Sequence, residues 1–139
     1  PAVDAGDPCD IHPRDKQTPA LRFAASVLQH VYQFPVRGDA PYVENCEMRD
    51  SGTIQLTFAN APEGLCTSDG KDPGGFVVLE DPERLIRVPA KIENNGVTVF
   101  IPPDTHPVEL RYCYAAYDAA ANLWSRDGLP VLPFRKRFR

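Results

Sequence analysis

Prolines interrupt this chain so often that long helices and long central strands are excluded over most of its length. There are 15 prolines among 139 residues, roughly twice the usual share of ~5%, and proline is poorly tolerated inside helices and central strands. Hydrophobic residues at 42% and charged residues at 24% are still typical of a packed core. The composition therefore predicts one ordinary domain, or one domain with a piece of another, built from short elements and rigid turns.

One segment has the periodicity of a helix. Thr18 can accept hydrogen bonds from the first turn, and Pro19 occupies the first helical position, where its missing N–H costs nothing. Phe34-Pro35 ends the segment, because the residue before a proline is pushed out of the helical region. Between these signals apolar residues recur at 3.6-residue spacing, which requires one buried face: Leu21, Ala24, Ala25, Leu28 and Tyr32.

After Pro35 the period of the apolar residues changes from 3.6 to 2. Alternating or apolar runs predict short strands at residues 53–58, 76–79, 85–92, 97–101 and 110–114. Pro89 breaks one of these runs as at a sheet edge, and Asn94-Asn95-Gly96 predicts a tight hairpin because it tolerates positive φ. Short strands without intervening helices indicate a mainly β fold, an antiparallel β-sandwich of jelly-roll-like type or a barrel.

The helix does not fit such a sheet arrangement. It precedes all the predicted strands, its apolar face is wide, and a proline-rich junction at residues 34–41 separates it from them. We therefore predict two parts. Residues 1–35 form the closing loop and helix of another domain, and residues 36–139 form the β-domain.

Charge and hydropathy exclude several classes of partner. The net charge is −4, and the last five residues include four basic ones, so the rest of the chain is near about −8. This balance argues against nucleic-acid binding. The basic end is interpreted as a solvated or frayed terminus, with contact to an anionic surface as the alternative. No apolar run approaches the roughly 18 to 20 residues of a membrane span, so no membrane contact is predicted.

The four cysteines do not form a metal site by spacing. Cys9, Cys46, Cys66 and Cys113 include no CxxC pair, and no histidine lies at ligand spacing from them. Disulfides and free thiols both remain open. The chain starts at Pro1 without a methionine, which fits a processed or excised piece, so any targeting signal is expected upstream.

The densest chemical feature is the segment at residues 7–16, Asp-Pro-Cys-Asp-Ile-His-Pro-Arg-Asp-Lys. Here His12 lies between carboxylates on a proline-stiffened loop, which is how a general base is usually held. The carboxylate fixes the imidazole tautomer and stabilises the imidazolium once a hydroxyl has lost its proton. From these residues alone, a solvated surface histidine is the competing interpretation.

A series of motifs along the chain resembles the C-terminal part of sialate O-acetylesterases. They are Asp-Ile-His-Pro-Arg-Asp-Lys-Gln at 10–17, Ala-Leu-Arg-Phe-Ala at 20–24, Leu-Arg-Tyr at 110–112, Asn-Leu at 122–123, and the ending at 128–135 from Gly-Leu-Pro to Pro-Phe-Arg. The resemblance covers nearly the whole chain in the family's order. It implies an SGNH-hydrolase-type α/β catalytic domain, in which a Ser and a His, usually oriented by an Asp, remove O-acetyl groups.

By this resemblance His12 is the catalytic base. The wider superfamily places the orienting Asp three residues before the His, where this chain has Cys9. Asp10 is therefore the first candidate and Asp7 the second, and a backbone carbonyl is a third way to orient the ring. The nucleophile and the oxyanion hole are expected outside this chain. No serine lies in a Gly-x-Ser-x-Gly elbow, and Ser51 lacks the Gly that precedes the superfamily's Asp-Ser pair.

Other reactive or aromatic residues have weaker patterns. A thiol nucleophile at Cys9 beside the catalytic His has no further support in the sequence. His30 and His106 are interpreted as surface or capping residues. Tyr117 and Trp124 could stack on a sugar ring or pack within the β-domain.

The predicted function is therefore the C-terminal segment of a serine esterase that removes O-acetyl groups from sialic acid or a related sugar. The segment supplies the base, and a second chain or a preceding part carries the Ser nucleophile. The partners are thus an acetylated sugar and that nucleophile-bearing part, with no cofactor and no metal. A secreted, periplasmic or lysosomal location is favoured over the cytoplasm. The alternative is a non-catalytic β-sandwich accessory or carbohydrate-binding module.

Overall fold

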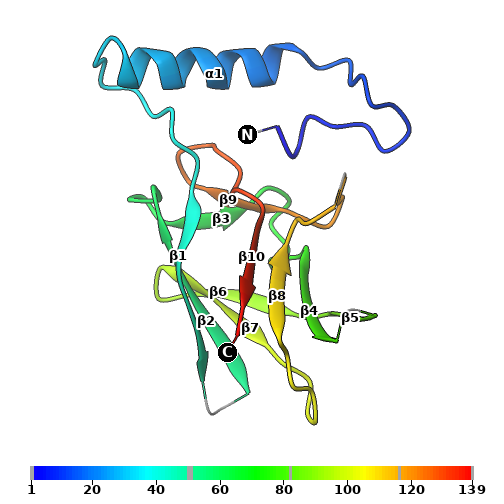
Figure 1. The fold of residues 1–139 in the computed structure, drawn as a ribbon. Helices are drawn as coiled ribbons and strands as arrows, with labels where there is room; N and C mark the ends of the chain where they lie inside the picture. The colour runs from blue at the N-terminus through cyan, green and yellow to red at the C-terminus, as the bar shows by residue number, and fades with distance from the viewer. Residues whose placement is uncertain (1, 50–51, 82, 116, 139) are drawn as a thin grey trace.

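The structure of this chain is a computed structural model that describes residues 2–49, 52–81, 83–115 and 117–138. A helix lies across one end of a β-rich body, and the N-terminal loop runs back beneath it (Figure 1). The elements of the described residues are α1 (Gln17–His30), β1 (Tyr42–Arg49), β2 (Thr53–Ala59), β3 (Leu65–Thr67), β4 (Phe76–Asp81), β5 (Arg84–Arg87), β6 (Ala90–Glu93), β7 (Gly96–Phe100), β8 (Glu109–Tyr112), β9 (Leu123–Ser125) and β10 (Phe134–Arg137).

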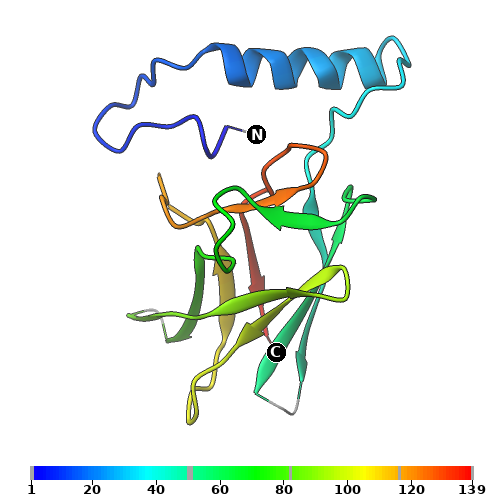
Figure 2. The ribbon, with the colours of Figure 1, turned by 180° about the vertical axis from the view of Figure 1, so that it is seen from behind.

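Two four-stranded antiparallel sheets enclose the core (Figures 1 and 2). One has the strand order β1-β2-β7-β6 and the other β10-β8-β4-β5, while β3 and β9 form a two-stranded sheet at the end nearest α1 (Figure 2). Inward-facing side chains of both large sheets are buried, among them Ile54, Leu56, Val78 and Leu110. Alternation places every second side chain of a strand on this inner face. The mainly β antiparallel sandwich predicted from the sequence is confirmed.

Aromatic rings occupy the centre of the β10-β8-β4-β5 sheet. The ring centroid of Tyr112 lies 4.8 Å from that of Phe76 and 5.6 Å from that of Phe134. The Tyr112 hydroxyl accepts a hydrogen bond of 3.0 Å from the backbone N–H of Leu123, and burial raises the pKa of this hydroxyl. The bond ties the two-stranded sheet to the main core.

The strand predicted over residues 85–92 is two strands. β5 pairs with β4 and β6 pairs with β7, so Val88 and Pro89 lead the chain from one sheet to the other. Pro89 has no N–H and cannot donate a hydrogen bond to either ladder, which is the reason for the break. The predicted hairpin follows directly: Asn94 and Asn95 have φ of 48° and 64°, and β6 and β7 pair from Glu93 and Gly96 onward.

Four strands carry no clear alternation in the sequence, namely β1, β3, β9 and β10. Of these, β10 contradicts the expected frayed terminus, because it pairs with β8 from Phe134 opposite Tyr112 to Arg137 opposite Glu109. Phe134 anchors the strand by packing among the core aromatic rings. The basic residues of this strand gave no sign of it in the sequence, although Arg135 and Arg137 alternate with the half-buried Phe134 and Lys136.

The helix is confirmed, but its ends and its burial differ from the prediction. It runs from Gln17 to His30. Asp15, not Thr18, braces its start, since the Asp15 carboxylate accepts a 2.9 Å hydrogen bond from the Thr18 N–H. Hydrogen bonds from the Thr18 side chain and backbone lower the pKa of Asp15.

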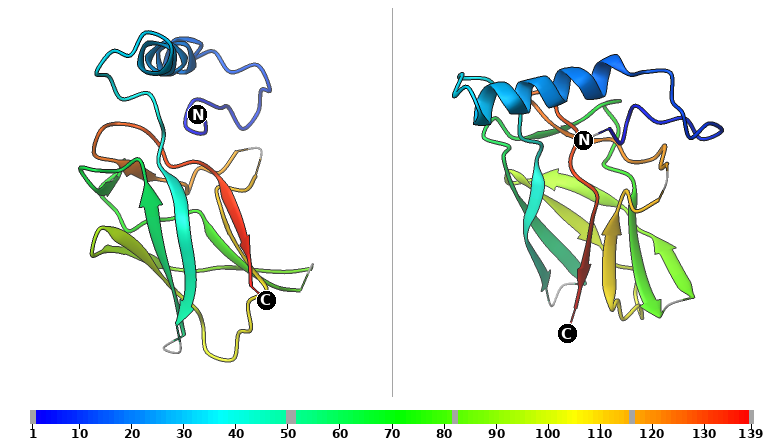
Figure 3. Two further views of the ribbon diagram at one scale, coloured as in Figure 1. Left: turned by 60° about the vertical axis from the view of Figure 1, so that its left-hand side comes forward. Right: turned by 45° about the horizontal axis from the view of Figure 1, so that its top comes forward.

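The predicted buried face of α1 is not covered within this chain. No α1 residue is buried, and Leu21 and Phe23 are 61% and 72% exposed. An end-on view shows the helix standing off the β-domain, with the N-terminal loop beside it (Figure 3). The contacts of the helix with the rest of the chain include the Arg22–Asp4 pair and the approach of Gly38 to the Ser26 backbone.

The chain that leads from α1 to β1 packs tightly against the helix. A Cβ atom on Gly38 would lie 2.5 Å from the Cα atom of Ser26, so only glycine fits there without movement. The Gly38 N–H donates to Gln29 Oε1 at 2.6 Å. Gln29 Nε2 and His30 Nε2 lie 3.0 and 2.7 Å from the two carboxylate oxygens of Asp39. The interpretation of His30 as a structural surface residue is confirmed.

Candidate functional site

The loop at residues 7–12 is braced by its own carboxylates. Asp7 Oδ1 accepts a 2.8 Å hydrogen bond from the Cys9 N–H, and Asp10 Oδ1 accepts one of 2.8 Å from the His12 N–H. Such aspartate turns hold a short loop in place of regular secondary structure. Asp7 and Asp10 also form an isolated β-bridge. Both predicted orienting residues therefore shape the loop that presents His12.

The His12 side chain is exposed and extends from this braced loop. Within the described residues, no hydrogen bond or ion pair involves its ring, and the contact with Asp10 is made by the His12 backbone N–H. One oxygen of each aspartate is occupied by a backbone donor. An orienting partner for the imidazole is thus not assembled here, and its role as a base stays a prediction.

A pocket of about 360 Å³ lies beside the loop. Its lining is drawn from the N-terminal segment together with one aromatic residue of the β-domain: Gly6, Asp7, Pro8, Cys9, Asp10, Ile11, Pro13 and Tyr117. A Cβ atom on Gly6 would lie 3.1 Å from Cδ2 of Tyr117, so the two segments touch. The fold brings Tyr117 next to the loop with His12, although more than a hundred residues separate them in the chain. Sequence spacing could not have predicted this contact.

An arginine clamp attaches the N-terminal segment to the β-domain. The Arg22 guanidinium donates two hydrogen bonds to the Asp4 carboxylate, at 2.6 and 2.9 Å, and lies 5.4 Å from the centre of the Trp124 ring. The hydrogen bond from Arg22 is the main reason that the pKa of Asp4 lies below its usual value. Trp124 therefore carries a guanidinium on its ring, which favours the packing interpretation of this residue over sugar stacking.

We expect Arg22→Ala to loosen the N-terminal segment while the β-domain stays folded. Losing a charge-assisted bidentate pair and a cation–π contact should raise amide hydrogen exchange in residues 2–16 roughly tenfold. Hydrogen exchange followed by mass spectrometry measures this directly. Arg14→Ala, which removes an exposed arginine from the same segment, is the control. Equal exchange in both variants would show that the clamp does not hold the loop.

The four cysteines are free thiols. Cys9 is exposed on the loop, whereas Cys113 is buried and Cys46 is half-buried. Burial raises the pKa of Cys46 to about 11 and also raises that of Cys113, so these two remain protonated and unreactive at neutral pH. No group of three or more His, Cys, Asp or Glu side chains in the described ranges could hold a metal ion.

The serines that the structure describes lie in structural settings. Ser26 is half-buried on α1, against Gly38, and Ser68 is exposed in a turn. The buried Ser125 hydroxyl lies 3.3 Å from both the Leu129 oxygen and the Leu129 nitrogen. Ser51 lies outside the described residues. None of the three described serine hydroxyls forms a hydrogen bond with His12.

In the described part of the chain, no helix is long and apolar enough to cross a membrane.

No protein-family model and no curated protein sequence matches this chain. A solved structure does, that of a carbohydrate acetylesterase from Xanthomonas citri, with 30% sequence identity and a TM-score of 0.87. The chain is a structural relative of a carbohydrate esterase. The match covers 99% of this chain, so it includes the loop, α1 and both sheets of the β-domain.

Our chain corresponds to only a part of the Xanthomonas enzyme, because the match spans 32% of the length of that enzyme. The similarity runs through the segment with His12 as well as through the β-domain. An esterase-associated role is supported for the chain as a unit.

Proposed function

We propose that this chain is the C-terminal segment of an SGNH-type carbohydrate O-acetylesterase, with His12 as its base and the Ser nucleophile in a preceding part or a second chain. The observation that carries the proposal is the 99% coverage of the chain by an acetylesterase structure, joined to the sialate O-acetylesterase-like motif around His12. Acetylated sialic acid, or a similarly acetylated sugar, is the proposed substrate.

In the proposed reaction the imidazole of His12 accepts the proton of the Ser hydroxyl as its oxygen attacks the acetyl carbonyl. The imidazolium then returns that proton to the sugar oxygen, the C–O bond of the ester breaks, and the deacetylated sugar leaves. A water molecule, activated by the same imidazole, hydrolyses the acetyl-enzyme to acetate and free Ser. Asp10, or in second place Asp7 or a backbone carbonyl, orients the ring.

The uncovered helix face supports a nucleophile-bearing neighbour. Leu21 and Phe23 are largely exposed, and Tyr32 and Phe34 stack on each other 6.4 Å apart while also exposed. An apolar patch of this kind marks a surface that another part of a protein covers. We propose that the α/β part carrying the Ser packs on α1, covers this patch and shields the exposed His12 from water.

Replacing each of the two loop aspartates by asparagine distinguishes the effect of its negative charge from the effect of its hydrogen bond to the loop backbone. Asparagine keeps the side-chain oxygen that accepts from the backbone N–H, so Asp10→Asn and Asp7→Asn should both preserve the loop. We expect Asp10→Asn in the full-length parent to lower kcat roughly 100-fold or more, through the lost charge behind the imidazolium. Asp7→Asn is expected to retain activity within a few-fold. The reverse ranking would assign the orienting role to Asp7, and no effect of either would favour a backbone acceptor.

The direct test is hydrolysis of an acetyl ester by the full-length parent carrying His12→Ala. Unimpaired turnover would overturn the proposal. It would leave the loop as a linker and the chain as a non-catalytic accessory module.

A further inference from the structure

Three arginines form a row across the outer face of the β10-β8-β4-β5 sheet. Val77 is paired with Arg87 on one side and with Arg111 on the other, and Arg111 is paired with Arg135. Directly paired residues of neighbouring strands project from the same face of a sheet. The inner face is occupied by the core residues of β4 and β8, so this row faces outward.

The positive charge of this face is only partly compensated. Buried Glu109 accepts hydrogen bonds from Arg111 and, at 2.9 Å, from Arg137. Burial acts to raise the pKa of Glu109, but these hydrogen bonds outweigh it and the pKa lies below its ordinary value. Asp118 lies 3.8 Å from Arg87. Four arginines thus share two carboxylates on the described part of this face, in a chain whose net charge is −4.

The uncompensated positive charge does not stabilise the sheet. Arg111 and Arg135 stand directly opposite each other, and like charges in that relation destabilise a strand pair. Both guanidinium groups lie near the half-exposed Tyr114 ring, 5.0 and 5.9 Å from its centre. This contact holds them at the surface without neutralising them. A bound anion would relieve the repulsion.

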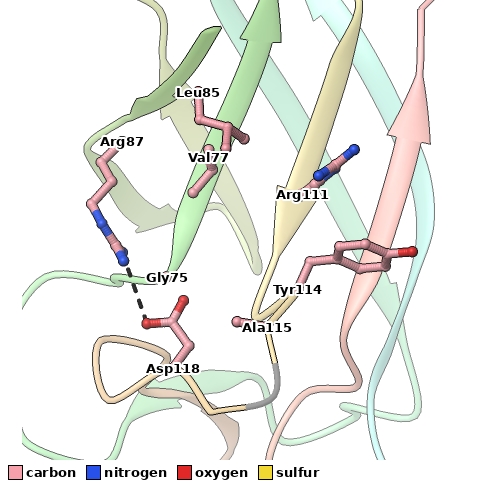
Figure 4. A pocket seen from close by; sticks show the side chains of 8 residues that line it. All are labelled: Gly75, Val77, Leu85, Arg87, Arg111, Tyr114, Ala115 and Asp118. Atoms are coloured by element: carbon pink, nitrogen blue, oxygen red, sulfur yellow. Dashed lines mark ion pairs between the residues drawn. The ribbon is translucent and has the colours of Figure 1, made fainter. Parts of the chain in front are cut away.

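A pocket opens beside this row (Figure 4). Its volume is about 310 Å³, at the small end of the usual range for ligand sites, about 300 to 1,000 Å³. The lining combines apolar surface with converging polar groups: Gly75, Val77, Leu85, Arg87, Arg111, Tyr114, Ala115 and Asp118. Figure 4 shows the Arg87–Asp118 pair on one side of Val77, and Arg111 with Tyr114 on the other.

We propose that this pocket binds a uronic acid residue of an acidic polysaccharide. Arg111 and Arg87 provide donors for the sugar carboxylate, since guanidinium groups bind carboxylates in bidentate fashion. Asp118 accepts hydrogen bonds from ring hydroxyls, and Val77 and Leu85 contact the apolar face of the ring. An apolar wall and a carboxylate acceptor suit a sugar acid better than an inorganic anion. The choice of a sugar rests on the proposed carbohydrate function. The expectation that the ligand is an anion rests only on the arginines of the pocket.

The test is a titration of the full 139-residue chain with sodium galacturonate, followed by the NMR signals of backbone amides. We expect shifts at Gly75, Val77 and Ala115, with a Kd on the order of 1 mM, as for one sugar ring in an open pocket. Galactose, which lacks the carboxylate, and acetate, which lacks the ring, should each bind at least about tenfold more weakly. Sodium chloride should weaken the binding of galacturonate.

Two substitutions locate the binding. Arg87→Gln replaces an exposed arginine of the pocket lining and leaves the Glu109 bonds intact, and it is expected to weaken galacturonate binding about tenfold. Arg49→Gln makes the same charge change on the other sheet and should bind like the unmodified chain. The amide spectrum without ligand verifies that each variant is folded.

Several outcomes would overturn this proposal. They are no shifts with galacturonate, equal binding of acetate or galactose, or equal loss in the Arg49→Gln variant. Equal binding of acetate would indicate a general anion patch. Because the titration does not involve His12, His12→Ala should bind galacturonate normally. A failure of the esterase proposal and a failure of this one are therefore separate results.

Discussion

Replacing His12 by alanine in the full-length parent is expected to lower kcat for acetyl-ester hydrolysis by at least about a thousandfold, with KM changed only a few-fold. Removing the general base leaves the Ser hydroxyl protonated and the leaving sugar oxygen without a proton donor, and both contributions are lost in the transition state. His12 is exposed and its ring has no partner among the described residues, so the substitution should not destabilise the fold.

The matched control is His106→Ala. His106 is also exposed, but it lies in the segment between β7 and β8, where its backbone N–H donates to Glu80 at 2.9 Å. Its substitution should leave kcat unchanged. Thermal unfolding of both variants checks that the effect is catalytic, and a His12→Ala enzyme with normal turnover would sink the assignment of the base.

The second large effect is expected in the core of the β-domain. Leu56 is fully buried at the centre of β2, between β1 and β7. Leu56→Ala should lower the free energy of unfolding by about 2 to 5 kcal/mol, because it removes buried methyl groups and leaves a cavity that the sheets cannot close. Out of a total of about 5 to 15 kcal/mol, this is a large fraction. Urea denaturation measures the change.

Leu85→Ala is the control for that experiment. Leu85 also lies on a strand, but its side chain is 58% exposed, so the same substitution should cost less than about 0.5 kcal/mol. Repeating both measurements on residues 36–139 tests the predicted domain boundary. Leu56 belongs to the core cluster of the β-domain, so the loss of stability on its substitution should persist there. Loss of cooperative unfolding in the shorter chain would show that α1 and the loop are part of one folding unit.

Much of the fold could be predicted where packing imposes a period. Ile54, Leu56 and Val97 are buried and alternate with polar residues, and the Asn94-Asn95 turn has the positive φ that its residues favour. The strands without alternation were not predicted. β3 and β9 are too short for a period to show, and β10 depends on a single anchor, Phe134, that only the core reveals.

The candidate site was predictable only as a list of residues. The chemistry of His12, Asp10 and Asp7 follows from their side chains and their closeness in the chain. Their arrangement does not, because a side chain can satisfy a neighbouring backbone N–H as readily as an imidazole, and here both aspartates brace the loop. Tyr117 joins them through tertiary contact alone.

The local features of this protein follow from its sequence: the helix, the main strands, the turns and the loop with the histidine. Each depends on residues close together in the chain, whose conformational preferences and spacing act locally. Which side chains from distant parts of the chain come into contact depends on the three-dimensional fold. In the folded chain the apolar face of α1 is exposed, and Arg22 lies over the Trp124 ring. Arg87, Arg111 and Arg135 lie in one row on the same face of a sheet. These depend on strand register and sheet order, which long-range burial sets.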